Sequence, residues 1–272
     1  MSRFPTEAWR RRLGRTLRRV RGRLPRYTLY LQPQGLQSWA TGSRSGAGVV
    51  ATAFAGFEPW CVANAGADAT VCVSGHLLHS LVVDSALALD DATAVRSYAR
   101  QQFTHYHGPQ AQHWPLAAWC DDRSAVVCAL HALDLAALQS TAAKHDVRLC
   151  SVAPVWSAGL NSLAAFKPSF AAPGARALAL LEGSLLTWLV ADAGRIVGLQ
   201  QRYLDAPRVA ALADLLDRLV REGPALAESP FVIGWGLDDG AEEALPRCQL
   251  LGPLDRQRTA AHWMLDAIGT GA

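Results

Sequence analysis

Several histidine, cysteine and aspartate side chains are spaced closely enough to suggest metal or nucleophile chemistry. His105 and His107 form an HxH pair near the end of an expected helix. Two positions along a helix correspond to a rotation of about 200°, so the two rings diverge and we expect no shared metal ion. Cys128, His131 and Asp134 have the residue types of a nucleophile, a base and an orienting acid. Their spacing across a strand–helix edge gives no orienting geometry, so we predict structural roles for them.

Two adjacent aspartate pairs offer carboxylates of the kind that bind Mg²⁺, namely Asp121 with Asp122 and Asp238 with Asp239. Aspartate is also common in turns, because its side chain hydrogen-bonds the local backbone. Both pairs lie between expected elements, so we predict turns there. The sequence contains no GxSxG nucleophile elbow and no GxxxxGKS/T phosphate loop. It therefore predicts no catalytic residue and no metal site.

The first 26 residues form a basic arm that differs in charge from the rest of the chain. They contain ten Arg and one Glu, whereas residues 27–272 contain 16 Lys and Arg against 22 Asp and Glu. The formal net charge of +3 is therefore the difference between a +9 arm and a −6 body. A mildly acidic body is not the composition of a basic nucleic-acid-binding domain.

The arm has the pattern of an amphipathic helix. Its apolar residues recur at spacings of 4, 4, 3 and 4, at Trp9, Leu13, Leu17, Val20 and Leu24. Such a helix suits an anionic membrane surface, where each basic residue contributes about 1 kcal/mol. A tail that orders only on a partner, and contact with RNA or DNA phosphates, remain alternatives. The residues expected at the membrane surface are Trp9, Arg10, Arg11, Arg12, Leu13, Arg15, Leu17, Arg18, Arg19, Val20 and Arg21.

The composition excludes several other classes of protein. Half of the chain is apolar and 18% is charged, which is typical of a globular protein. No run of 18 or more apolar residues is present, and the N-terminus lacks the apolar segment of a secretory signal. The six cysteines form no CxxC pair and mostly lie in apolar strand-like runs, so we expect buried free thiols. These features favour a cytoplasmic protein.

The body alternates expected strands and helices on either side of a Pro- and Gly-rich break at 167–174. Before the break we expect strands at 26–32, 36–42, 49–54, 69–75, 80–84, 115–120, 124–130 and 147–154, and helices at 90–105, 133–145 and 155–166. After it we expect a three-stranded meander at 175–183, 185–194 and 195–203, a helix at 206–222, strands at 230–236 and 248–253, and a helix at 254–268. This is the order of a ribonuclease-H-like lobe. We therefore predict an α/β fold with two such lobes in reduced form, divided into a basic arm (1–25), lobe one (26–166) and lobe two (175–272).

The element order resembles that of the actin-like superfamily, and within it the PilM and GspL family of pilus and type II secretion assembly proteins. ATVCVSGHLLHSLVVD followed by TAVRSYARQQF is similar to the strand–turn–strand–helix of that family. SAVVCALHALDLAALQSTAAKHDVRLCSVAPVWSAGLNSL is similar to its crossing into the second lobe, and ARALALLEGSLLTWLVADAGRIVGLQQRYLD to its second phosphate hairpin. The resemblance covers about residues 27–252 and rests on order and spacing, with few identities.

An actin-like ATPase needs an acidic residue and a Gly-containing turn in each lobe, because backbone N–H groups hold the phosphates and the carboxylates act through Mg²⁺. In lobe one, Gln32 and Gln34 stand where an Asp is expected, and Pro33 removes a donor. Lobe two keeps an acid–Gly turn and, further on, two glycines that flank a bulky Trp. If nucleotide binds, the residues that the resemblance implies are Glu182, Gly183, Thr187, Gly234 and Gly236.

The resemblance, together with these departures, implies a non-catalytic cytoplasmic scaffold of a type IV pilus or type II secretion-like assembly, peripheral to the inner membrane and without a cofactor. Its partners are then an anionic membrane surface and a short segment of a single-pass inner-membrane assembly protein, docked in a groove of the lobes. An ATP- and Mg²⁺-binding switch of the same fold is one alternative. An α/β protein that binds nucleic acid through the arm is another. The sequence assigns neither the docking residues nor the oligomeric state.

Overall fold

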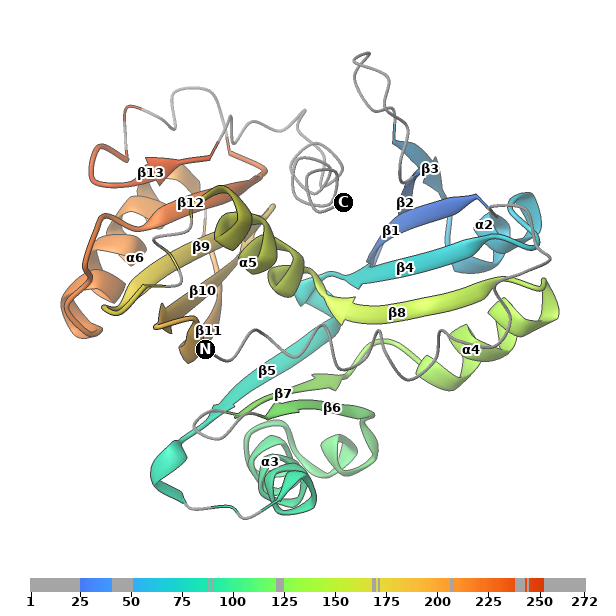
Figure 1. The fold of residues 1–272 in the computed structure, drawn as a ribbon, viewed down its shortest axis with the longest axis horizontal. Helices are drawn as coiled ribbons and strands as arrows, with labels where there is room; N and C mark the ends of the chain where they lie inside the picture. The colour runs from blue at the N-terminus through green and yellow to red at the C-terminus, as the bar shows by residue number, and fades with distance from the viewer. Residues whose placement is uncertain are drawn as a thin grey trace.

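The computed structural model describes residues 25–40, 51–87, 89, 91–120, 125–167, 170, 172–205, 208–237, 243 and 245–251. The expected helix of the basic arm, both aspartate pairs and the expected helix at 254–268 lie outside these residues. The described part is a mixed α/β protein (Figure 1). None of the helices in this part has the length and apolar content needed to span a bilayer.

Five of the described strands form the first sheet, in the order β3 (Thr52–Phe54), β2 (Gly35–Ala40), β1 (Arg26–Gln32), β4 (Asp68–Val73) and β8 (Arg148–Pro154). The first three strands pair antiparallel, and β1, β4 and β8 pair parallel. Pro33 and Gln34 form the turn between β1 and β2. Gly35 follows with a φ of 149°, and a Cβ there would lie 2.7 Å from the carbonyl oxygen of Phe54. Only glycine therefore fits where β2 passes β3.

Helices α2 (Phe57–Ala63) and α4 (Leu135–Lys144) contact each other beside the first sheet. Trp60 of α2 and Leu138 of α4 are buried in the core that the sheet also lines. The Trp60 indole nitrogen donates to Ser38 Oγ on β2 at 2.8 Å, so its one polar atom is satisfied inside the core. Asp134 begins α4, because its carboxylate accepts the N–H of Ala137 at 3.0 Å.

The second sheet repeats this arrangement. Its described strands have the order β11 (Arg195–Tyr203), β10 (Leu185–Asp192), β9 (Arg176–Glu182), β12 (Phe231–Trp235) and β13 (Gln249–Leu250). Again the meander is antiparallel and the last two strands add in parallel. Helix α6 (Arg208–Glu222) packs a face of Leu212, Leu215, Leu216 and Leu219 against this sheet. Both five-stranded sheets therefore have the order of a ribonuclease-H-like sheet.

A third sheet is inserted in the chain between β4 and β8. Its described strands have the order β5 (Leu78–Val83), β7 (Ala125–Leu130) and β6 (Leu116–Cys120), and its connections include the short helices η1 (Gly75–Leu77), η2 (Ser85–Leu87) and η3 (Pro109–His113). Helix α3 (Ala92–His107) covers it with Val95, Ala99 and Phe103, which are four residues apart and buried. Asp91 begins α3 by accepting two backbone N–H groups. In Figure 1 this sheet and α3 lie below the other two sheets.

One hydrophobic core joins the two five-stranded sheets. It includes Leu29 of β1 from the first sheet, and Leu178 of β9 with Phe231 of β12 from the second. Helix α5 (Val155–Phe166) lies between the sheets in Figure 1. Its Trp156 and Leu160 are one turn apart and belong to the same core. The sheets are thus packed on one another through a shared apolar interior, and the ends of their central strands meet.

The order of strands and helices expected from the sequence is confirmed within the described residues, with one omission. Helix α2 was not expected. Its seven residues contain Pro59, and only Trp60 and Cys61 are buried, so no apolar period repeats along it. Tertiary contact with α4 and the first sheet, not a local pattern, decides this helix.

The expectation of buried thiols is confirmed for Cys61, Cys72 and Cys128 and is wrong for Cys150. Burial raises the pKa of Cys61 to about 11, and raises those of Cys72 and Cys128 to about 12. Cys150 is exposed on β8, where the register with β4 shifts from Leu149 to the residue after Cys150. Cys150 is therefore the extra residue of a β-bulge, and it is exposed together with the next residue, Ser151.

Candidate functional site at the junction of two sheets

The carboxyl ends of the central strands converge on one acidic side chain, Glu182. It is the last residue of β9 in the second sheet, and it lies opposite Trp235 of β12. The first sheet contributes Tyr30 near the end of β1 and Ser74 directly after β4. In open α/β sheets, ligands bind outside the carboxyl ends of the strands. This junction is therefore the place where a functional site is expected.

Glu182 forms hydrogen bonds that cross from the second sheet to the first. Its Oε1 accepts the Tyr30 hydroxyl at 2.7 Å and the Ser74 hydroxyl at 2.7 Å. The backbone N–H of Gly75 lies 3.1 Å from Oε2 and 3.2 Å from Oε1. Because Ser74 Oγ accepts the N–H of His76, its own proton is directed at the carboxylate. Glu182 of the second sheet is therefore held by three donors, one on β1 of the first sheet and two in the segment that follows β4.

Burial dominates the electrostatics of this contact. Glu182 and Tyr30 are 2% and 1% exposed, so neither group is screened by water. Burial raises the pKa of Glu182, while the hydrogen bonds from Ser74, Tyr30 and Gly75 act in the opposite direction. Burial and the neighbouring Glu182 charge raise the pKa of Tyr30 well above its usual value. The phenol therefore keeps its proton and serves as a donor.

A second set of contacts joins the short helix η1 to the second sheet beside the carboxylate. His76 Nε2 lies 3.0 Å from the carbonyl oxygen of Glu182, and Gln201 of β11 donates to the carbonyl oxygen of Gly75 at 3.2 Å. The exposed Tyr203 places its hydroxyl 3.4 Å from His76 Nδ1. The backbone of η1 is thus fixed to the second sheet from both of its sides.

Glycines allow the backbones to approach closely at this junction. A Cβ on Gly75 would lie 2.8 Å from both Gln201 Nε2 and Glu182 Oε2. Gly234 has a φ of 137°, and a Cβ there would lie 2.0 Å from the carbonyl oxygen of the neighbouring β9 residue. Gly236 has a φ of 106° and would place a Cβ 2.5 Å from Gly183 Cα. Gly234 and Gly236 therefore pack backbone on backbone, whereas Gly75 packs against side chains of the second sheet.

A cavity of about 250 Å³ opens beside the carboxylate. It is lined by Tyr30, Gln32, Gln34, His76, Glu182, Gly183, Ser184 and Trp235. The rings of Tyr30 and Trp235 meet edge to face with their centroids 5.4 Å apart. Among these described residues there is no Lys or Arg to neutralise a phosphate. Ligand sites of drug-sized molecules typically have volumes of about 300–1,000 Å³, so this cavity is small for a nucleotide.

The structure brings together only part of the nucleotide set that the resemblance implied. Glu182 and Gly183 line the cavity, whereas Gly234 and Gly236 pack against β9 and its turn. Thr187 is buried inside β10 and is not a lining residue, and its hydroxyl has no hydrogen-bond partner among the described residues.

Sequence reasoning missed the other half of the site, which consists of Tyr30, Ser74, Gly75 and His76. The available signal was a Ser-Gly pair near the end of an expected strand, a combination that also occurs in nucleophile elbows. Without the position of Glu182, nothing in that pair indicates which group it binds. The membrane-surface residues of the arm lie outside the described residues.

The other chemical candidates have structural roles. Cys128 is buried, and its sulfur lies 3.2 Å from Ser80 Oγ. Asp134 caps α4, and the His131 ring stacks on His79 at 4.3 Å between centroids, so no nucleophile, base and acid converge. His107 also stacks on His79, with 4.0 Å between the ring centroids. The described residues contain no group of three metal-ligating side chains.

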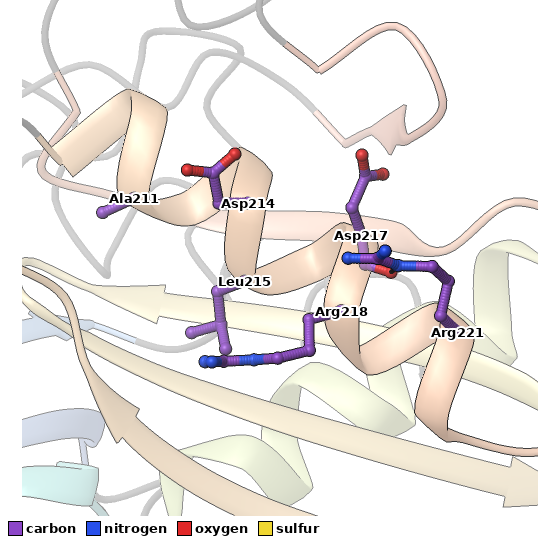
Figure 2. Close-up of a pocket in the computed structure, with 6 residues that line it drawn as sticks. All are labelled: Ala211, Asp214, Leu215, Asp217, Arg218 and Arg221. Carbon is purple, nitrogen blue, oxygen red and sulfur yellow. Dashed lines mark hydrogen bonds between the residues drawn. The ribbon is translucent and has the colours of Figure 1, made fainter.

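A shallow groove of about 330 Å³ runs along the outer side of α6. Figure 2 shows the four charged side chains that line it with Ala211 and Leu215, namely Asp214, Asp217, Arg218 and Arg221. Each acid is followed four residues later by an arginine, so charges of opposite sign are paired along the helix. Arg221 donates to the Asp217 carbonyl oxygen at 3.1 Å. This is the pattern of a solvated helix face, and it adds no ligand chemistry to the junction.

Comparison with known proteins identifies the class of fold. No family model and no curated protein matches the sequence. Among solved structures, a Bacteroides thetaiotaomicron protein with an actin-like ATPase fold and unknown function aligns with a TM-score of 0.57, at 7% identity over 89% of this chain and 95% of that one. The chain therefore has an actin-like fold, as the sequence resemblance predicted.

Two further solved structures have the same fold. The PilM–PilN type IV pilus biogenesis complex aligns with a TM-score of 0.55, at 10% identity over 91% of this chain and 98% of that one. The cytoplasmic domain of EpsL, an inner-membrane component of the type II secretion system of Vibrio cholerae, aligns with a TM-score of 0.53, at 13% identity over 91% and 96%. The resemblance to the PilM and GspL group is confirmed at the level of the fold.

Proposed function

We propose that this chain is a non-catalytic scaffold of a type IV pilus or type II secretion-like assembly, which docks at the inner membrane and binds a membrane partner. In this proposal, residues 26–166 and 175–272 are the two lobes of the actin-like fold, and residues 1–25 are a basic amphipathic arm. The fold likeness to PilM and to the EpsL cytoplasmic domain supports the type of assembly.

The observation that carries the non-catalytic assignment is the bonding of Glu182. A carboxylate that acts through Mg²⁺ needs a lone pair directed at the metal or its water. Here Tyr30, Ser74 and Gly75 engage both carboxylate oxygens from the first sheet. In the β1–β2 turn, Gln32 and Gln34 offer only neutral amides to the cavity. The acid that the turn motif retains is therefore used to join the two sheets.

An ATP-binding switch of the same fold is the second candidate, because Gly183 and Ser184 still form a turn beside a cavity. Titration of the full chain with mant-ATP and Mg²⁺ separates the two candidates. We expect no saturable fluorescence change up to millimolar nucleotide. Micromolar binding would overturn the nucleotide-free assignment and favour the switch.

The membrane assignment rests on the charge of the arm. Ten Arg in the first 26 residues, at about 1 kcal/mol each near an anionic surface, provide enough attraction to hold a protein on a bilayer. Cosedimentation with vesicles of anionic and of zwitterionic lipid tests this directly. We expect binding to anionic vesicles alone, and loss of binding on deletion of residues 1–25. Retention on RNA with no vesicle binding would favour the nucleic-acid alternative.

The partner assignment predicts that a neighbouring reading frame encodes a single-pass membrane protein. It is tested by co-expression of the full chain with that protein. We expect the two to co-purify from detergent extracts, and the membrane-bound fraction of the chain to rise. A chain that stays unbound and binds Mg²⁺-ATP would contradict the scaffold proposal.

A further inference from the structure

The contacts of Glu182 have the composition of an anion-binding site. Two hydroxyls and one backbone N–H converge on a single carboxylate, and the two O–H···O distances are both 2.7 Å. Hydrogen bonds to an ionised acceptor are short, at about 2.5–2.7 Å for O–H donors. Ser74 is completely buried and Tyr30 is 1% exposed, so the donors are enclosed by protein.

The donors and the anion belong to different parts of the fold. Tyr30 and Ser74 are 152 and 108 residues away from Glu182 in the chain. Each donor is positioned without Glu182: Tyr30 by its register in β1, and Ser74 by its N–H, which donates to Leu31 O at 2.8 Å. The donor site is thus built by the first sheet, and the second sheet supplies the group that fills it.

We propose that Tyr30, Ser74 and Gly75 form an anion site that the chain fills with its own Glu182 carboxylate, and that this site accepts a small free carboxylate when the side chain is removed. This inference rests on the proposed function, in which the junction closes without nucleotide. Glu182 then acts as an internal ligand: it closes the contact between the sheets and blocks external anions from the same donors.

The space that the Glu182→Ala substitution leaves defines the class of ligand that can bind. Glu182→Ala keeps Cβ and removes one methylene and one carboxylate, which together have the composition of acetate. Acetate therefore restores the lost atoms, with its methyl group in place of Cγ. Propionate adds one methylene to a buried space, which costs packing energy. Chloride has the charge but lacks two oxygens held at the spacing of a carboxylate, so it does not reproduce the geometry to which the three donors are directed.

The test is thermal unfolding of the full-length Glu182→Ala variant in sodium acetate, sodium propionate and sodium chloride at equal ionic strength and pH 7. We expect a lower Tm than wild type in chloride and a saturable rise in acetate. At an acetate concentration ten times the dissociation constant, the ratio of folded to unfolded protein rises about 11-fold. Wild type shows no such acetate-specific rise, because its site is filled.

Two further variants identify the site. Adding Ser74→Ala to Glu182→Ala removes one donor, and the acetate response should fall at least several-fold. Glu182→Gln fills the space without the charge, so we expect a lower Tm than wild type and no response to acetate. A Glu182→Gln variant as stable as wild type overturns the proposal, as does an acetate response of Glu182→Ala equal to that in propionate or chloride.

The experiment stays decisive if Glu182→Ala does not fold in chloride. Refolding from urea is then measured in each salt, and we expect soluble protein to be recovered in acetate only. Equal recovery in all three salts contradicts the anion site. The assay contains no partner and no nucleotide, so its result is independent of the function tests: failed partner binding leaves the acetate result standing, and a failed acetate test leaves the scaffold assignment standing.

Discussion

Removing the Tyr30 hydroxyl is the smallest change that tests the junction. Tyr30→Phe deletes the 2.7 Å bond to Glu182 and keeps the ring that packs on Trp235. A hydrogen bond to a charged group contributes about 1.5–3 kcal/mol, and the bond is buried, so water cannot replace it. We expect the free energy of unfolding at pH 7 to fall by about 2 kcal/mol.

The effect of Tyr30→Phe should depend on pH in a defined direction. Burial raises the folded-state pKa of Glu182 above its usual value of 4.5. The protonated group therefore stabilises the fold below pH 4.5, and this contribution is lost as the pH rises through the folded-state pKa. Loss of one donor raises that pKa further, so the variant loses more stability than wild type as the pH rises. At low pH the variant lacks only a hydrogen bond between neutral groups, and the difference in the free energy of unfolding between wild type and variant falls to about 1 kcal/mol.

Urea unfolding followed by tryptophan fluorescence, between pH 4.5 and pH 8, measures both effects. Tyr27→Phe is the matched control, because Tyr27 lies on the same strand and its hydroxyl has no hydrogen-bond partner in the described part of the chain. We expect the control to stay within about 0.5 kcal/mol of wild type, because the half-buried Tyr27 loses no hydrogen bond and keeps the ring that packs on Trp60. Equal stability of the two variants at pH 7, or a Tyr30→Phe effect that grows toward low pH, would refute the assignment of Glu182 as a buried, donor-held carboxylate.

Three other predictions concern the glycines, the histidines and the thiols. Gly234→Ala should lower the free energy of unfolding by about 3 kcal/mol or more in urea titrations, because its φ is 137° and its Cβ would meet a β9 carbonyl oxygen at 2.0 Å, whereas Gly198→Ala meets only ordinary contacts at 3.6 Å and should be mild. Burial and the two stacked histidines lower the pKa of His79 to about 4, so its contribution to stability is complete above pH 6.5 and is lost as the pH falls toward 4. His79→Phe should flatten the thermal-stability profile over that range, and an unchanged slope would contradict this. Peptide mapping after brief alkylation should find label on exposed Cys150 before buried Cys128, and the reverse order would contradict the bulge at β8.

The order of the elements was predictable because strand and helix patterns are local. Alternation and apolar runs indicated the strands of the meander at 175–203 and most of the other strands. Helix α2 was not predicted because it is short and has no repeating pattern. The exposure of Cys150 was not predicted because a bulge depends on the partner strand, which the sequence of β8 does not specify.

The candidate site was predictable only on one side. An acid followed by glycine at a hairpin is a local signal, and it singled out Glu182 and Gly183, which line the cavity. The same reasoning assigned Gly234 and Gly236 to a ligand turn, whereas they serve the close approach of β12 to β9 and its turn. A glycine in such a turn indicates a position that has no room for a side chain. It does not show whether a ligand or another stretch of backbone occupies the space beside it.

By itself, the sequence determined the separation of charge between the arm and the body, the lack of a nucleophile or phosphate-loop motif, and the succession of strands and helices. These follow from composition and from periodicities within a few residues. Only the tertiary structure decided what Glu182 does, because its donors Tyr30 and Ser74 come from strands more than a hundred residues away. The role of a buried acid depends on which donors surround it and how much water they exclude. Both are set where the two sheets meet, and neither is encoded in the residues next to Glu182.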